Sequence, residues 1–358
     1  MNAPSFHSLV VEAIEHDTDD AVVVTFAVPP ALADAFRFRH GQYVTLRVGL
    51  DGEELRRSYS ICSPVGGPLR VGIKQVDGGA VSSWANTELR VGDTIDVMTP
   101  AGRFTSELDP AAAHRYVCVA AGSGVTPVLS IVSTVLAAEP LSQVTLVYVN
   151  RSARSAMFVD EFDDLKARHL GRLSTWFLFS RDQTELELCN GRLDRDRCRM
   201  LIDHGVLPVD ADGYFLCGPQ PMTEGVTSVL RAAGVAADAI HIELFAAATP
   251  PIRRHAVATG PVDRRPVIAT VTARCNGRTT TFGLREGDVV LDAGLPERPE
   301  LPYSCHAGVC ATCRARVTEG AAAMDVAHGL EPAEIAAGFV LTCQARPTTP
   351  TLTVDYDA

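Results

Sequence analysis

The chain has 358 residues, of which 46% are hydrophobic and 21% are charged, and its formal net charge is −11. A chain of this length and composition holds two or three folded domains, and its acidic balance argues against nucleic acid as a partner. No apolar stretch is long and charge-free enough to span a bilayer, and no basic, apolar targeting pattern is present. Six of the ten cysteines are scattered, mostly within apolar runs, and indicate a reducing compartment. We therefore expect a cytoplasmic protein that does not associate with membranes.

Residues 1–108 have the pattern of a closed antiparallel barrel. Short alternating runs are broken by Gly, Pro and Asp, which is typical of strands joined by turns. Six runs are predicted as strands: His7–Ile14, Val22–Val28, Gln42–Val48, Arg56–Cys62, Leu69–Gln75 and Thr94–Met98. The sequence thus predicts an antiparallel Greek-key β-barrel as the first domain.

Two segments of the barrel carry candidate ligand-binding residues. In the fourth run, Arg57 can bind a diphosphate through two hydrogen bonds, Tyr59 offers a face to a flat heterocycle, and Ser60 can hydrogen-bond a ring nitrogen. Taken alone, these three residues suit an ordinary solvated strand face equally well. A glycine-rich stretch then opens a predicted helix, whose N-terminus suits an anion. The candidates there are Gly79, Val81 and Ser82.

Residues 109–247 alternate between strand-like and helical patterns, which is typical of a doubly wound α/β sheet. The first strand-like run is continuously apolar, as expected for a parallel strand buried on both faces. Five runs are predicted as strands: Tyr116–Ala121, Val144–Val149, Thr175–Phe179, Tyr214–Cys217 and Ile240–Phe245. Helical segments lie between them.

A glycine-rich turn follows the first of these strands and suits a pyrophosphate. Gly122 and Gly124 permit a tight turn, and Pro127 fits the first turn of the helix that follows, whose N-terminus offers N–H groups to an anion. Thr126 lies in the same turn. By itself Gly-x-Gly-x-x-Pro is a weak motif, because a plain strand-to-helix turn has the same composition.

Residues at the ends of three later strands are candidates for the rest of a dinucleotide. Ser180 and Arg181 follow the third strand, where a hydroxyl and a guanidinium favour the 2′-phosphate of NADPH; a solvated strand end is the alternative. Asn150 and Arg151 end the second strand and could contact the same ligand. After the fourth strand, a glycine turn leaves room for a nicotinamide ring; its residues are Cys217, Gly218 and Pro219.

The remaining residues are predicted to form a linker and a small third domain. Residues 248–265 are rich in proline and arginine and read as a semi-extended tether. Residues 266–358 fit an α+β β-grasp fold with a hairpin at Asn276-Gly277. The predicted strands are Val267–Arg274, Thr279–Leu284, Arg314–Val317, Val340–Cys343 and Thr351–Tyr356, with a helix over Asp288–Leu295.

Four cysteines of the third domain are the strongest motif in the chain. Cys305, Cys310 and Cys313 are spaced Cys-x4-Cys-x2-Cys, and Cys343 follows at a distance. This is the plant-type ferredoxin spacing of a [2Fe–2S] cluster, given as an example in general accounts of such sites. A zinc ribbon would need a second Cys-x2-Cys or a His pair at short range, which the sequence lacks. A disulfide framework fits less well, because the cysteines are not dense.

Four motifs, in this order, resemble those of the ferredoxin–NADP reductase superfamily: Arg57-x-Tyr59-Ser60, Gly79-x-x-Ser82, Gly122-x-Gly124-x-x-Pro127 and Cys217-Gly218-Pro219. With a C-terminal plant-type ferredoxin domain, the chain resembles reductase components of bacterial oxygenases. Over essentially its whole length it is similar to the reductase subunits of phenylacetyl-CoA epoxidases. The stretches that carry this similarity are residues 6–9, 51–62, 120–127, 301–305 and 338–345.

The resemblance implies roles for the site residues. The first domain would bind FAD, the second NADPH, and the third a [2Fe–2S] cluster. Tyr59 would stack on the isoalloxazine, Ser60 would lie near its N5, Cys217 would border the nicotinamide, and Phe245 would be the family's flavin-side aromatic residue. Arg57, Gly79 and Ser82 would hold the FAD diphosphate.

The implied activity is electron transfer from NADPH through FAD and the cluster to a separate oxygenase. No histidine follows a glutamate by three residues, so the Glu-x-x-His motif of a di-iron site is absent from this chain. The resemblance implies as acceptor the di-iron subunit that epoxidises phenylacetyl-CoA in phenylacetate degradation. Two alternatives stay open: a reductase for another oxygenase, such as a steroid hydroxylase or a ring-hydroxylating dioxygenase, and a redox sensor without turnover.

Overall fold

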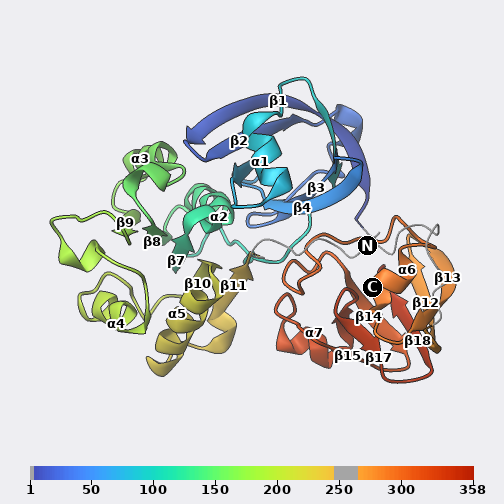
Figure 1. The fold of residues 1–358 in the computed structure, drawn as a ribbon. Helices are drawn as coiled ribbons and strands as arrows, with labels where there is room; N and C mark the ends of the chain where they lie inside the picture. Colours follow the sequence, from blue (N-terminus) through green and yellow to red (C-terminus); the bar gives the residue numbers. More distant parts are fainter. Residues whose placement is uncertain (1–3, 246–264) are drawn as a thin grey trace. The chain divides into compact units, whose positions relative to one another are not determined.

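The computed structural model describes residues 4–245 and 265–358 (Figure 1). These residues form two compact units. One contains His7–Leu55 and Tyr59–Phe245, and the other contains the C-terminal residues with residues 4–6 and Arg56–Ser58. The expected linker, residues 248–265, lies outside the described residues except for Arg265. In the described ranges, no helix has the length and apolar character needed to cross a membrane.

The N-terminal part of the first unit is a six-stranded sheet in the order β4-β3-β6-β1-β2-β5. A bridge between Ile61, just after β4, and Val71 on β5 joins the two ends of the sheet and closes it. The strands are antiparallel, and non-consecutive strands are neighbours, as predicted for a Greek-key barrel. Its elements are β1 (Phe6–Thr18), β2 (Ala21–Ala27), β3 (Tyr43–Leu50), β4 (Glu53–Ser60), β5 (Leu69–Lys74), β6 (Thr94–Met98) and helix α1 (Ala80–Thr87).

The barrel closes around its own apolar core. On β1, Leu9 and Val11 are fully buried, while Val10 between them is 44% exposed. This alternation is typical of a strand with one face in the core and the other in solvent. Phe26 and Leu46 fill the interior from β2 and β3. The two-residue period in the sequence therefore sets which side chains fill the barrel.

The second part of the same unit is a parallel sheet in the order β11-β10-β7-β8-β9. All five predicted strands are present. The strands are β7 (Arg115–Ala121), β8 (Gln143–Asn150), β9 (Leu173–Phe179), β10 (Gly213–Gly218) and β11 (Ile240–Leu244). The helices are α2 (Val125–Ala138), α3 (Val159–Arg168), α4 (Arg195–Asp203) and α5 (Gln220–Ala232).

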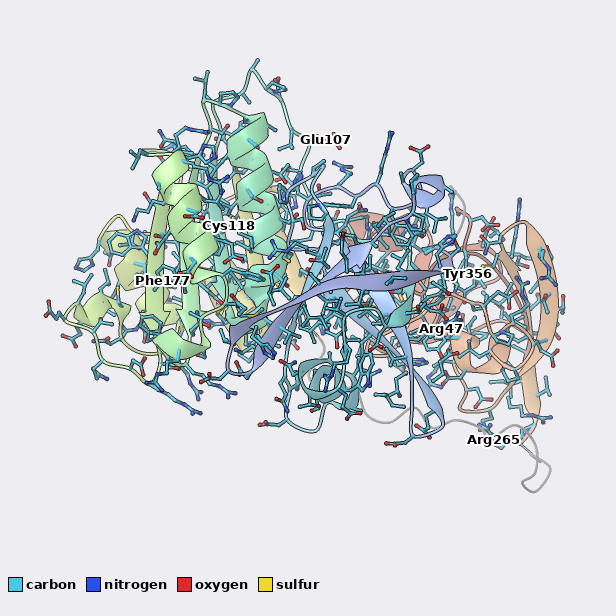
Figure 2. The ribbon with its side chains drawn as sticks, turned by 90° about the horizontal axis from the view of Figure 1, so that it is seen from above. Arg47, Glu107, Cys118, Phe177, Arg265 and Tyr356 are labelled. Carbon is cyan, nitrogen blue, oxygen red and sulfur yellow. The ribbon has the colours of Figure 1, made fainter. Side chains whose placement is uncertain are left out.

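Helices cover both faces of this sheet, which explains the continuous apolar runs. Cys118 on β7 packs in one cluster with residues of α2 and α3, including Phe162. Its neighbour Val119 packs in a second cluster with residues of α4 and α5, including Leu201 and Val226. Figure 2 labels Cys118 and Phe177, which lie on β7 and β9. A strand buried on both faces must be apolar at every position.

The C-terminal unit has a five-stranded sheet in the order β13-β12-β18-β14-β16 and a two-stranded sheet of β15 and β17. The predicted hairpin is confirmed, because Asn276 and Gly277 both have positive φ (52° and 69°) between antiparallel β12 and β13. Its elements are β12 (Val267–Cys275), β13 (Arg278–Arg285), α6 (Val290–Gly294), β14 (Arg314–Glu319), β15 (Ala322–Met324), α7 (Pro332–Ala336), β16 (Phe339–Leu341), β17 (Ala345–Pro347) and β18 (Thr351–Asp355).

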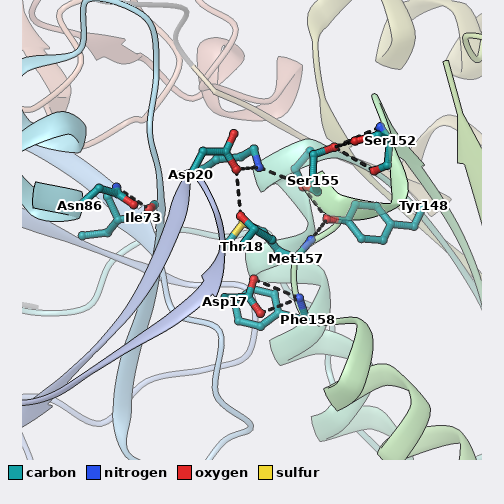
Figure 3. A network of polar contacts seen from close by, with 12 residues as sticks. Asp17, Thr18, Asp20, Ile73, Asn86, Tyr148, Ser152, Ser155, Met157 and Phe158 are labelled. Carbon is teal, nitrogen blue, oxygen red and sulfur yellow. Dashed lines mark hydrogen bonds and ion pairs between the residues drawn. The ribbon is translucent and has the colours of Figure 1, made fainter. Parts of the chain in front are cut away.

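A polar seam joins the barrel to the parallel sheet within the first unit (Figure 3). The Asp17 carboxylate accepts the backbone N–H of Phe158 at 3.1 and 3.2 Å from its two oxygens. Lys74 donates both to Asp20, at 2.6 Å, and to the carbonyl of Ser155, at 3.1 Å. The seam therefore ties one end of β1 and β5 to the segment that leads into α3.

Asp17→Asn is expected to change how stability depends on pH. Burial raises the pKa of the Asp17 carboxyl from 3.8 to about 6, against the opposing effect of the Phe158 N–H. A raised native pKa contributes stability below pH 4 that is lost as the pH rises through 6. The asparagine variant lacks this loss, so its free energy of unfolding relative to wild type should increase between pH 4 and 7. The full shift corresponds to about 3 kcal/mol, which solvent screening reduces to about 1 kcal/mol.

Urea unfolding of both proteins at pH 4, 5, 6 and 7 measures this difference. Asp19→Asn, which alters an exposed neighbouring carboxylate, is the matched control and should show no such trend. A difference between Asp17→Asn and wild type that stays constant or falls with pH would contradict the assignment.

Candidate cofactor sites

The first candidate site begins on β4 of the barrel. Arg57 and Tyr59 alternate with Ser60 along the strand, so Ser60 faces the opposite side of the sheet. Ser60 is 4% exposed, and Tyr59 is partly buried against the barrel core. Arg57 donates to the carbonyl of Arg56 at 2.8 Å. Near the end of one strand, a cation, an aromatic face and a buried hydroxyl are thus within four residues.

Ser60 contacts one residue of the parallel sheet, Glu243. Its hydroxyl donates to Oε2 of Glu243 at 3.4 Å. Glu243 lies on β11 and pairs with Cys217 on β10. The structure therefore brings Ser60 and Cys217, both predicted as site residues, to the same carboxylate. Phe245 follows β11 and is 39% exposed.

Glu243 is a residue that the sequence prediction did not assign to the site. Burial raises the pKa of its carboxyl to about 8, and Ser60 opposes this shift. The residue as a whole is partly buried. Burial, reinforced by Glu243, also raises the pKa of the fully buried Cys217 thiol. At neutral pH the cluster therefore holds a protonated carboxyl, a hydroxyl and a neutral thiol.

The predicted dinucleotide loop lies at the carboxyl end of β7. Residues Gly122–Gly124 form a short 3-10 turn, and α2 begins at Val125 without a side-chain cap. Gly122 has φ +54°, which favours glycine. At Gly124 a Cβ would lie 2.3 Å from the carbonyl oxygen of Cys217, so only glycine allows this approach. The loop and the Cys217-Gly218-Pro219 turn therefore pack together.

The other members of the loop stabilise its shape. Thr126 and Pro127 are buried, and the Thr126 hydroxyl donates to the carbonyl of Ser123 at 2.9 Å. The N–H groups of the first helical turn have no acceptor within their own helix. A helix N-terminus preceded by such a glycine turn suits a pyrophosphate, and this geometry fits a nicotinamide dinucleotide.

The two candidates for the 2′-phosphate, Ser180 and Arg181, lie just after β9, beside Asn150 and Arg151 at the end of β8. Ser180 N–H donates to Asn150 C=O and Arg181 N–H donates to Arg151 C=O, both at 2.9 Å. Asn150 is buried, while both arginine side chains are exposed. Two guanidinium groups and a hydroxyl at one strand edge can bind a dianion through charge-assisted hydrogen bonds.

The glycine-rich turn of the barrel leads into helix α1, as predicted. Helix α1 begins at Ala80 with Gly79 as its N-cap and no capping side chain. Ser82 is 5% exposed, and its hydroxyl donates to Gly79 C=O and accepts from Val76 N–H, both at 3.1 Å. Val81 packs in the barrel core. The Ser82 hydroxyl therefore fixes the shape of the turn, and the role of these three residues toward a diphosphate stays a prediction.

The cysteine loop of the C-terminal unit is sharply bent. His306, Gly308 and Ala311 all have positive φ (51°, 72° and 55°). The N–H groups of Ala307 and Cys310 donate to the sulfur of Cys305 at 3.3 and 3.4 Å. The Cys310 thiol and these backbone donors lower the pKa of Cys305 to about 6. The loop is therefore built to stabilise thiolate, the form that binds metal.

The four cysteines associate as two pairs. The thiols of Cys305 and Cys310 interact with each other, as do those of Cys313 and Cys343. Further donors to sulfur are the Thr312 hydroxyl, at 3.2 Å from Cys310, and Gln344, at 3.7 Å from Cys343. Within residues 4–245 and 265–358, no three potential ligands converge as a site for a single ion. Two thiolate pairs fit a cluster of two irons with two protein ligands each.

Three family models match successive parts of the chain. Residues 8–106 match an oxidoreductase FAD-binding domain, residues 118–228 an oxidoreductase NAD-binding domain, and residues 273–348 a 2Fe-2S iron-sulfur cluster binding domain. These are the segments that carry the candidate flavin, dinucleotide and cluster residues, so the motifs and the fold agree on three cofactors.

Two curated relatives span nearly the whole chain. A component of the 1,2-phenylacetyl-CoA epoxidase of Escherichia coli (strain K12) is 41% identical over 99% of this chain and 98% of its own length. The ferredoxin reductase component of 3-ketosteroid-9-alpha-monooxygenase from Rhodococcus rhodochrous is 31% identical over 97% of this chain and 96% of its own length.

Solved structures share the fold. Phthalate dioxygenase reductase has a TM-score of 0.59 and 23% identity over 98% of each chain. An intact type IV self-sufficient cytochrome P450 monooxygenase has a TM-score of 0.67 and 23% identity, covering 98% of this chain and 41% of the other. The order of barrel, parallel sheet and cluster domain therefore recurs in both.

Proposed function

Because the chain belongs to the family of FAD- and NAD-binding reductase components of oxygenases that carry a 2Fe-2S domain, we propose that it transfers electrons from NADPH to the di-iron subunit of a phenylacetyl-CoA epoxidase. The observation that supports this choice is the 41% identity to the Escherichia coli epoxidase component over 99% of the chain. The cytoplasmic location expected from the sequence is part of this proposal.

The barrel residues would bind and orient the flavin. Arg57 and the N-terminal turn of α1 at Gly79 would hold the FAD diphosphate, and Tyr59 would stack against the ring. When bound, FAD accepts the two electrons of a hydride and releases them singly, as a one-electron cluster requires. The domains are assigned accordingly: residues 1–108 to FAD, 109–247 to NADPH and 266–358 to the cluster.

Ser60 and Glu243 would hold a proton at the flavin site. A carboxyl with a pKa of about 8 is protonated at neutral pH, so Glu243 would offer a hydrogen-bond donor and a proton at this site. The 3.4 Å hydrogen bond from Ser60 connects the flavin-binding strand to this carboxyl. Phe245, two residues after Glu243, would cover the flavin until the nicotinamide replaces it.

The parallel sheet would bind the dinucleotide across its carboxyl edge. The Gly122–Pro127 loop would take the pyrophosphate, and the turn at Cys217, Gly218 and Pro219 would border the nicotinamide. Asn150, Arg151, Ser180 and Arg181 would take the adenosine end, with its 2′-phosphate.

A coupled assay tests the choice of acceptor. The purified protein is combined with the di-iron subunit of a phenylacetyl-CoA epoxidase, and NADPH oxidation is measured with and without phenylacetyl-CoA. We expect consumption to depend on the thioester and product to form in step with it. NADPH-dependent reduction of cytochrome c without any coupling would keep the reductase activity but refute this acceptor.

A second acceptor is supported by the 31% identity to a 3-ketosteroid-9-alpha-monooxygenase reductase over 97% of the chain. To test it, the coupled assay is repeated with the oxygenase component of the 3-ketosteroid-9-alpha-monooxygenase system in place of the di-iron subunit. Coupling there, and none with the di-iron subunit of the epoxidase, would favour the second acceptor.

A further inference from the structure

The loop between β8 and α3, residues 152–158, is held from two sides. We call it the bridging loop. From the barrel, Asp17 accepts the Phe158 N–H and Lys74 donates to the Ser155 carbonyl. From the parallel sheet, the hydroxyl of Tyr148 accepts the Met157 N–H at 3.0 Å (Figure 3). The bridging loop therefore connects barrel side chains to a single tyrosine on β8.

Tyr148 extends this connection to the dinucleotide loop. Its hydroxyl donates to the carbonyl of Gly122 at 3.1 Å. The side chain is fully buried, and the ring packs near Phe162 and Phe177. A buried aromatic ring has little rotational freedom, so its hydroxyl holds the two loops at a fixed separation.

We propose that Tyr148 is a positioning residue for the pyrophosphate of the nicotinamide dinucleotide. The inference rests on the proposed function, in which the Gly122–Pro127 loop takes that pyrophosphate. Tyr148 acts through Gly122, and the barrel acts on Tyr148 through the bridging loop. A chain of hydrogen bonds thus runs from Asp17 and Lys74 of the barrel through Tyr148 to the dinucleotide loop.

The peptide geometry explains how a carbonyl can orient a donor. In a planar trans peptide, the C=O of one residue and the N–H of the next point in opposite directions. Holding Gly122 C=O toward Tyr148 therefore turns the N–H of Ser123 to the other side of the loop. Apart from its chain neighbours, no residue has a heavy atom within 4 Å of the Cβ position at Gly122. Two donors hold the Gly122 carbonyl, the Tyr148 hydroxyl and the Val125 N–H of the turn itself, and only the first of them connects the loop to the barrel.

Packing from the barrel reinforces the connection. A Cβ at Gly72, on β5, would lie 2.7 Å from Cγ2 of Thr126 and 3.0 Å from Cε of Met157. Strand β5 therefore packs against both the dinucleotide loop and the bridging loop. A displacement of one loop would change the packing of the other.

The same sheet supplies a matched control in Tyr214. This residue is also fully buried, on β10, and its hydroxyl accepts from Ala211 N–H at 3.0 Å and donates to Pro208 C=O at 3.1 Å. Its partners lie before β10, at the end of the strand away from the Cys217-Gly218-Pro219 turn. Tyr214→Phe removes an equivalent pair of hydrogen bonds without touching the loop.

The experiment compares wild type, Tyr148→Phe, Tyr214→Phe and Lys74→Met as FAD-loaded full-length proteins, with ferricyanide as electron acceptor. Tyr148→Phe should raise the KM of NADPH and of NADH alike by about fivefold, the factor for one neutral hydrogen bond, because both carry the same pyrophosphate. The kcat should stay within about twofold. Tyr214→Phe should leave both KM values unchanged while lowering the melting temperature to a similar extent.

Lys74→Met removes one of the two barrel side chains that hold the bridging loop and leaves the Asp17 contact in place. It should raise both KM values about twofold, in line with a weaker, indirect hydrogen-bond effect. It decides the matter if Tyr148→Phe does not fold. Equal KM values in Tyr148→Phe and Tyr214→Phe, or unchanged KM values in Lys74→Met, would overturn this inference alone. A wild-type protein without turnover of either dinucleotide would overturn it together with the proposed function.

Discussion

Cys310→Ser should abolish NADPH-dependent cytochrome c reduction while leaving ferricyanide reduction by the flavin nearly intact. The thiol of Cys310 interacts with that of Cys305, and the spacing of the four cysteines predicts Cys310 to be a cluster ligand. A serine hydroxyl is a hard donor that stays protonated at neutral pH, so it is a poor substitute for a thiolate. We expect a loss of at least about 100-fold in cytochrome c reduction, which corresponds to about 2.7 kcal/mol in the barrier.

The controls separate cluster loss from general damage. Cys275→Ser alters a buried cysteine of the same unit that is not one of the four ligands, and should keep both activities. Iron content should fall in Cys310→Ser and stay unchanged in Cys275→Ser. Undiminished cytochrome c reduction by an iron-free Cys310→Ser protein would show that electrons leave directly from the flavin, and would contradict the proposed order.

Regular elements were predictable because their patterns are local. All six barrel strands, five parallel strands and five strands of the C-terminal sheet occur where the hydrophobic periodicity indicated. The Asn276-Gly277 turn requires two residues with positive φ, which these residue types adopt readily. The sequence prediction missed β15, β17 and α7. Three-residue strands and a five-residue helix are too short to carry a periodic signal.

The candidate sites were predictable only in part, because contacts between distant residues leave no local pattern. Ser60 and Glu243 are 183 positions apart, and only the fold brings them together. The available signal was an acidic residue at the carboxyl end of a parallel strand, where α/β folds place ligands. The sequence pattern predicted only a strand position for Tyr148. Its hydroxyl bonds to the backbone of two distant loops, and no sequence pattern indicates which backbone groups a buried hydroxyl contacts. The roles of the site residues stay predictions.

We expect cofactor preference to depend on charge at the ends of β8 and β9, and the variant Ser180→Asp/Arg181→Ala should raise the KM of NADPH far more than that of NADH. The backbone N–H of Arg181 donates to the carbonyl of Arg151 at 2.9 Å, so the two arginines lie next to each other at the same edge of the sheet. The double variant removes one cation and adds a carboxylate beside the proposed 2′-phosphate. Losing a charge-assisted hydrogen bond costs about 2–3 kcal/mol, so the KM of NADPH should rise about 100-fold.

The KM of NADH should change by less than about threefold, because NADH has a hydroxyl where NADPH carries the phosphate, and a carboxylate can accept a hydrogen bond from that hydroxyl. Steady-state kinetics with both cofactors and ferricyanide measure the two values. Arg199→Ala, which removes an exposed arginine of the same sheet domain from α4, controls for the loss of positive charge alone and should alter neither KM. Equal increases for NADPH and NADH in the double variant would mean that the edge of β8 and β9 contacts a part common to both cofactors, and the 2′-phosphate would then have to be bound elsewhere.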